Sequence, residues 1–410
     1  MGNAKRRMGD RQTVMLASIW ITVIWLAADM YLPALPTLVA EFNTTEAVIN
    51  STMMANTLSL AFGSLLGGPL TDKVGRRAPL LIAAVLVIVA NAACACATSP
   101  DQLIALRIFA GSAGGLIIST VMAVLRDRFN ADKLASAVTV SQSFAVLGPL
   151  VAPFLGSLLL TFASWRGIYI LLAILSAACF LWTLALEETL PLDQRADISI
   201  VGSLGLVFDI ARDRSFMLVL GALCMAPLTF GTYLLTCSYV YLQFFSLDYI
   251  GYSICYFIAI LIELAAPFIY ERLSRKVSPL AIMITIGGLL ALAGGLVIAV
   301  GTTSPVAFLF GCAFFIIASG MGRAFAYVVL MGSCKRNAGA ASALITFSLN
   351  LFAGFGAPIA SIPLWPNHVI GTGAPSLFAG IMLLAITFIL VGPVGSKILD
   401  KMPKAHGESS

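Results

Sequence analysis

Four charged residues stand inside long apolar stretches of the sequence: Asp29, Arg107, Glu263 and Arg323. A charge placed in hydrocarbon costs about 2.5–3.5 kcal/mol on insertion scales, so such residues usually mark a route for protons, ions or substrates. A carboxyl group beside an arginine can bind and release a proton, because burial favours the neutral acid whereas the cation favours the carboxylate. We therefore take these four residues as candidates for proton coupling.

The depths of Asp29 and Arg107 can be compared by counting along their helices. Asp29 lies ~24 Å from the start of its apolar stretch near residue 13, at 1.5 Å per residue. Arg107 lies ~6 Å from the start of its own stretch, which runs in the opposite direction. In a hydrocarbon core of ~30 Å both residues reach about the same depth. They form either a pair that a proton can switch or a permanent ion pair that only holds two helices together.

The other two charges, Glu263 and Arg323, both fall in the cytoplasmic half of their stretches and are able to pair with each other. This pair is either a structural bridge or a second coupling element. Trp25 lies one helical turn before Asp29 on the same face, where it would either stack on a flat ligand or face lipid. Amide side chains in the stretches usually bridge helices, but some can line a substrate cavity, with Gln142 as the first choice. The cavity candidates are Trp25, Asp29, Asn56, Gln142 and Asn350.

The elements that must position these residues are membrane-spanning helices. Of the 410 residues, 60% are hydrophobic and 10% are charged, whereas a soluble domain carries roughly 25% charged residues. Since a spanning helix needs about 20 apolar residues, the sequence predicts twelve spans. They fall near 13–36, 47–69, 78–98, 103–125, 135–161, 167–186, 216–244, 249–270, 279–300, 305–333, 339–365 and 375–396.

The distribution of basic residues predicts how these spans are oriented. With both termini in the cytoplasm, 21 of the 24 Lys and Arg residues fall in cytoplasmic segments, and Arg166 alone falls in an outside loop.

No cleavage pattern follows the first span, so we expect this span to be retained in the mature protein. We interpret the eight cysteines as small buried apolar residues rather than as metal ligands or disulfides. We expect an N-terminal six-helix half at 1–186, a cytoplasmic linker at 187–215 and a C-terminal six-helix half at 216–410.

The segment at 68–77, between the second and third spans, combines glycine, an acid and paired bases. Its pattern recurs 199 residues later at 267–276. Two six-helix halves related by such a repeat are typical of the major facilitator fold. The segment resembles the cytoplasmic-loop motif of major facilitator transporters. We interpret the glycine as permitting close helix packing and the acid as stabilising a helix N-terminus. The matching residues are Gly68, Asp72, Gly75, Arg76 and Arg77.

Three further segments resemble bacterial twelve-span drug:proton antiporters of the Bcr/CflA type and their MdfA-like relatives. The first is Asp29–Pro36, and the second is Arg107–Gly111, where Ala110 stands in place of the usual Gln. The third lies in the fifth span and resembles the antiporter motif, with the alternative of a merely kinked helix. Its glycines and prolines are Gly148, Pro149, Pro153 and Gly156.

The resemblance implies an all-α protein of the bacterial inner membrane that exports drug-like molecules in exchange for protons by alternating access. We expect a monomer with small-molecule substrates, protons and lipid as partners, and without metal, cofactor or nucleic acid. A metabolite transporter of the same fold, either an exporter or a proton symporter, is the alternative. The sequence has neither a metal-spaced His/Cys cluster nor a nucleophile with a paired base, which argues against a membrane enzyme.

Overall fold

The computed structural model describes residues 8–195, 200–333, 338–362 and 364–391, and these residues form helices and loops without a strand. The chain separates into two compact units, Met1–Leu204 and Gly205–Ser410. The basic residues predicted for the N-terminal tail before residue 8, for 335–336 and for the C-terminal tail lie outside the described ranges, as does Cys334. Of the described cysteines, Cys96 is exposed, so the prediction of a buried side chain was wrong there.

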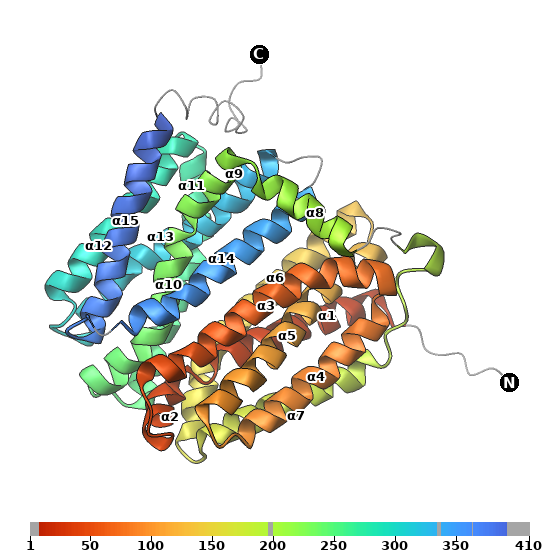
Figure 1. Ribbon diagram of the computed structural model, residues 1–410, viewed down its shortest axis with the longest axis horizontal. Helices are drawn as coiled ribbons and strands as arrows, with labels where there is room; N and C mark the ends of the chain where they lie inside the picture. The colour runs from red at the N-terminus through yellow and green to blue at the C-terminus, as the bar shows by residue number, and fades with distance from the viewer. Residues whose placement is uncertain (1–7, 196–199, 334–337, 363, 392–410) are drawn as a thin grey trace. The chain divides into compact units, whose positions relative to one another are not determined.

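The first unit is a bundle of long helices (Figure 1). Helix α1 packs on α6, α3 packs on α5, and α4 packs on both α5 and α7. Two short elements follow α1, and the 3₁₀ turn η2 at Leu192–Gln194 follows α7. The helices are α1 (Asp10–Asp29), α2 (Leu35–Glu41), α3 (Glu46–Val74), α4 (Arg77–Ala95), α5 (Pro100–Arg128), α6 (Ala131–Leu160) and α7 (Trp165–Thr183).

The second unit contains the remaining long helices, and α8 (Ile200–Ala211) runs across the boundary between the units. Helix α10 continues into a π-helical segment at Tyr239–Phe244. Helix α10 packs on α14, and α12 packs on α13 and α15. The helices are α9 (Arg214–Leu223), α10 (Met225–Ser238), α11 (Tyr249–Ser274), α12 (Pro279–Val300), α13 (Pro305–Ser333), α14 (Ala338–Ala360) and α15 (His368–Val391).

Eleven segments in the described part of the chain are long and apolar enough to cross a membrane. They correspond to the predicted spans except the second, at 47–69, which is helix α3. Helix α3 has the length to span but carries more polar residues, including Asn50, Asn56 and Asp72. The predicted linker at 187–215 contains η2 and the apolar helix α8, whose Leu206 and Phe208 are exposed, so this linker is less uniformly polar than expected.

The first predicted span is not one continuous helix. Helix α1 ends at Asp29, and a turn with a 3₁₀ segment at Leu32–Ala34 leads into α2. Pro33 contributes to the break, because proline cannot donate the backbone hydrogen bond that the Asp29 carbonyl would accept in a continuous helix, whereas Pro36 lies in the first turn of α2, where proline is tolerated. The break leaves the last carbonyl groups of α1 in need of partners inside the bundle.

Helix α6 lies close to α1 on both sides of its interior prolines. A methyl group at Gly148 would lie 2.8 Å from Cβ of Trp25, and one at Gly156 would lie 2.0 Å from the Met30 carbonyl oxygen. The hydroxyl of Thr22 also donates to the Phe144 carbonyl, at 2.9 Å. The glycines of the predicted antiporter motif thus let α6 pack against α1 beside the break at Asp29.

Candidate functional site

Arg107 projects from α5 onto the broken end of α1. It is 1% exposed, and its Nη1 donates to the Ala27 carbonyl at 2.9 Å. Its guanidinium carbon lies 4.2 Å from the centre of the Tyr31 ring. A cation at the C-terminus of a helix meets carbonyl groups that lack helical partners, which makes the charge easier to accommodate there.

Asp29 is the last residue of α1 and is 6% exposed. Arg107 contacts the residue two positions before it and the ring two positions after it. The structure therefore brings the arginine to the segment that carries the acid. Their role in proton coupling stays a prediction.

A small cavity lies within the first unit next to Arg107. It measures about 10 Å³, which is room for one water molecule. Asn56 of α3 lines it, as expected for a cavity residue, but the cavity is too small for a drug-like substrate. Asn91 of α4, an amide within a predicted span that is not among the cavity candidates, also lines it and is 1% exposed.

The remaining cavity candidates have different surroundings. Trp25 is half-buried against α6, whereas Gln142 of α6 is exposed. The side-chain amide of Asn350 donates to the Thr346 carbonyl at 3.0 Å, so this nitrogen forms a hydrogen bond within its own helix, α14. Their role in substrate binding stays a prediction.

Glu263 of α11 and Arg323 of α13 pair with each other in the second unit. The distance from Nη2 to Oε1 is 2.8 Å. The glutamate side chain is 15% exposed, whereas that of the arginine is 48% exposed. The pairing considered from the sequence is therefore present, and its function is untested.

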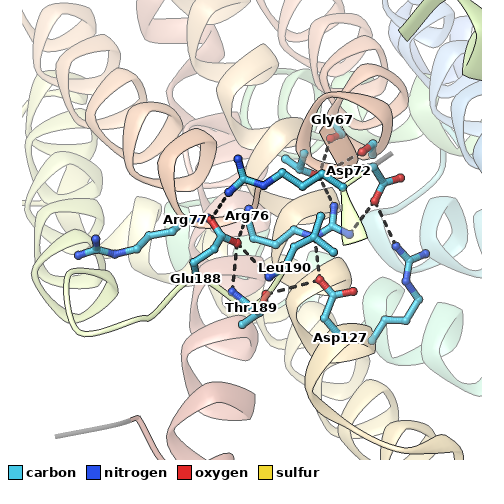
Figure 2. Close-up of polar contacts among 12 residues, drawn as sticks. Gly67, Asp72, Arg76, Arg77, Asp127, Glu188, Thr189 and Leu190 are labelled. Atoms are coloured by element: carbon cyan, nitrogen blue, oxygen red, sulfur yellow. Dashed lines mark hydrogen bonds and ion pairs between the residues drawn. The ribbon is translucent and has the colours of Figure 1, made fainter. Parts of the chain in front are cut away.

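The predicted loop motif forms a second polar site, between α3, α4 and α5 (Figure 2). Arg76 is 2% exposed at its centre. Its guanidinium contacts Asp72 at 2.6 Å, Asp127 at 2.8 Å and the Thr71 hydroxyl at 3.0 Å. Burial alone would lower the pKa of Arg76, but Asp127 and Asp72 raise it above its ordinary value, so the charge is retained.

Glu188 closes this site from the segment after α7 (Figure 2). Its carboxylate accepts from the backbone N–H groups of Arg76 at 2.8 Å and Arg77 at 3.2 Å, where α4 begins. It also accepts from the N–H groups of Thr189 and Leu190. Burial alone would raise the pKa of Glu188, but these donors lower it below its usual value. A carboxylate is favoured at this position because a helix N-terminus is positively polarised.

One interpretation of the loop motif needs correction. Gly68 does not bring helices together, since a methyl group there would meet open space. The neighbouring Gly67 does so, because a methyl group at that position would lie 2.0 Å from Ser119 Oγ. Asp72 pairs with arginine side chains, and the acid at the α4 N-terminus is Glu188. Gly75 is required for its backbone, which has φ +101°.

Sequence reasoning missed Asp127 and Glu188. The available signals were the alternation of charge at 126–128 and the acid pair at 187–188, directly after a span. Neither signal identifies a partner, because Arg76 is 51 residues from the first and 112 from the second. Only the packing of α3, α5 and the end of α7 brings them together.

Comparison with known proteins places this chain among membrane transporters. The chain is 34% identical to the uncharacterized MFS-type transporter YdgK of Bacillus subtilis over 197 residues, 47% of this chain and 48% of that protein, so the match spans about half of that relative. It is 24% identical to the multidrug resistance protein MdtL of Citrobacter koseri over 93% of both chains. The fold is similar to that of the xylose transporter XylE from E. coli, with a TM-score of 0.69 at 14% identity over 98% of this chain and 99% of that one.

The profile of the Major Facilitator Superfamily matches residues 17–358, which include the break at the end of α1, both α6 glycines and the polar site around Arg76. Since this match covers most of the chain, the protein is a multi-pass membrane transporter and not an enzyme. It belongs to the Major Facilitator Superfamily.

Proposed function

We propose that this transporter exports small amphiphilic, drug-like molecules in exchange for protons. The observation that carries the proposal is the placement of buried Arg107 against the broken end of α1, which holds buried Asp29. The similarity to a multidrug resistance protein over 93% of the chain supports export of drugs. The resemblance of the α6 segment that contains Gly148 and Gly156 to the antiporter motif supports exchange over simple uptake.

In the proposed cycle a proton and the substrate compete for Asp29. Substrate entering from the cytoplasm displaces the proton from the carboxylate, and a proton entering from outside neutralises the carboxylate and releases the substrate. Arg107 keeps its charge at the break in both states, because its Nη1 is held by the Ala27 carbonyl. Protonation thus changes the net charge of the segment without requiring the arginine to move.

The remaining parts of the proposal concern the second unit and the membrane. We assign the Glu263–Arg323 pair to a second coupling step, because an ion pair with one half-exposed partner can open without leaving both charges buried. Trp25, Asn56, Gln142 and Asn350 are proposed to contribute to substrate contacts. We also propose twelve spans, with α3 as the twelfth, and a monomer in the bacterial inner membrane with both termini cytoplasmic.

Asp29→Asn tests the proposal. The variant should insert normally but lose export, because an amide cannot exchange a proton. The measurement is drug resistance of a pump-deficient strain across a panel of amphiphilic drugs, followed by uptake of a transported drug into inverted vesicles with an imposed pH gradient. Asp101→Asn, at an exposed position near the start of α5, is the matched control and should transport normally. Full pH-driven transport by Asp29→Asn would refute the role of Asp29.

A further inference from the structure

Two residues that line the cavity, Arg107 and Asn91, carry buried hydrogen-bond donors for which the described part of the chain shows no acceptor. These donors are Nε and Nη2 of Arg107 and Nδ2 of Asn91. Both side chains are 1% exposed. Because a buried donor without an acceptor costs about 1–3 kcal/mol, and more when the group is charged, three of them around one cavity are unusual. Such an arrangement is typical of a site built for a ligand that accepts hydrogen bonds.

The donors come from two helices, and Arg107 is fixed by a contact outside the cavity. Arg107 is anchored through its third nitrogen, Nη1, to the Ala27 carbonyl. Asn91 lies inside α4. The rest of the lining is apolar apart from Asn56, and consists of Ile24, Ala27, Leu60, Val87 and Ala110. The site therefore presents a cation and an amide N–H group within an apolar shell.

The side chain at position 110 determines whether there is room for a ligand. Ala110 lies on α5, one turn after Arg107, and lines the cavity. A longer polar side chain at this position would reach into the cavity and could itself accept from the guanidinium. Because Ala110 has only a methyl group, an acceptor for the Arg107 guanidinium must be a group other than the side chain at position 110.

We propose that this cavity binds a single small monovalent anion, with chloride as the probe. An anion accepts from every donor that lines the cavity and offsets part of the guanidinium charge in an apolar surrounding. A water molecule would satisfy the donors but would present its own two hydrogens to a lining that is mostly apolar. The cavity, of about 10 Å³, admits one occupant of roughly the size of water and excludes polyatomic organic anions.

The test is thermal unfolding of the purified full chain in detergent, in sodium chloride and in sodium gluconate at matched ionic strength. We expect a saturable rise in Tm of roughly 3–5 °C with chloride at about one hundred times its Kd, and none with gluconate, which is too large to enter. Bromide should act like chloride and give an anomalous diffraction peak between Arg107 and Asn91 in a crystal. Because these measurements need no transport, they stand even if the proposed drug export fails.

Two variants remove the site in different ways. Ala110→Gln fills the cavity with a longer side chain. Asn91→Asp replaces the amide with a carboxylate of nearly the same shape, and so puts a negative charge beside the position of the anion. Both should lose the chloride-dependent rise in Tm, and Asn91→Asp should unfold in gluconate at or above the temperature of the parent protein. Ala105→Gln is the matched control, since Ala105 is an exposed alanine of the same helix, and should keep the rise.

Three results would overturn the proposal. The first is an equal Tm of the parent protein in chloride and gluconate. The second is a chloride-dependent rise that persists in both Ala110→Gln and Asn91→Asp, which would place the anion elsewhere. The third is density for water alone in the cavity of a crystal grown in bromide.

Discussion

At the scale of single residues, Glu188 is the acid on which the start of α4 depends. Its carboxylate accepts from four backbone N–H groups and is 31% exposed. Glu188→Gln should destabilise the protein by roughly 1–2 kcal/mol, a figure reduced for solvent screening, because an amide has one acceptor oxygen and no charge. Thermal unfolding of the purified protein measures this, with the exposed Glu271→Gln as a control expected to change little.

The pH dependence of stability follows from the pKa of Glu188, which lies below its usual value in the folded protein. The unfolded chain has a pKa of about 4.3 at this position. The stabilisation by Glu188 is therefore complete well above that pH, and is lost as the pH falls through the folded pKa. Parent and Glu188→Gln should differ most in Tm at neutral pH and converge in acid. A constant difference from pH 7 to pH 3 would contradict the role of the carboxylate.

The sequence singles out residues where one segment carries the signal. Asp29 and Arg107 stand out because charge inside an apolar stretch is costly, and Asp72 and Arg76 stand out through the spacing of the loop motif. Asn91 is visible as an amide within a span, but the sequence cannot show whether it faces a cavity or a neighbouring helix. Its position beside Arg107 depends on how α4 packs on α5.

At the scale of elements, two adjacent glycines of α3 should respond in opposite ways to the same substitution. Gly67→Ala would place a methyl group 2.0 Å from Ser119 Oγ and 3.1 Å from its Cβ, forcing α3 away from α5. We expect a loss of roughly 1–3 kcal/mol from such overpacking. Gly68→Ala meets open space and should be neutral or slightly stabilising, because alanine favours a helix over glycine.

Thermal unfolding of both variants in one detergent gives the comparison directly, since the two sites share a helix and differ by one position. Equal destabilisation by both would contradict the packing of α3 on α5. The same contrast explains a limit of prediction at this scale. Hydropathy located the long helices, but it could not show the end of α1 at Asp29 or which of Gly67 and Gly68 faces α5, because both depend on local backbone geometry and neighbouring helices.

At the scale of the whole molecule, the number of spans fixes the side of the membrane on which every later loop lies. If α3 crosses, the chain has twelve spans, and the basic residues near Arg76, Arg126 and Arg272 share the cytoplasmic side, as the positive-inside rule requires. If α3 does not cross, every loop after it changes sides relative to the N-terminus, and the basic N-terminal tail lies on the opposite side from the clusters near Arg76, Arg126 and Arg272. The charge distribution therefore favours a spanning α3 although its composition is less apolar than that of the other helices.

Alkaline phosphatase fusions distinguish the two topologies, because the enzyme is active only outside the cytoplasm. Fusions after residue 44, between α2 and α3, should be active, and fusions after residue 75, between α3 and α4, should be inactive. Fusions after residue 98, between α4 and α5, should be active again, which provides an internal control. If α3 fails to cross, the fusions after 44 and 75 will show the same activity and the one after 98 the opposite. That result would also invert α5 and place Arg107 near the cytoplasmic edge, at a different depth from Asp29, so the same fusions test both the topology and the proposed coupling site.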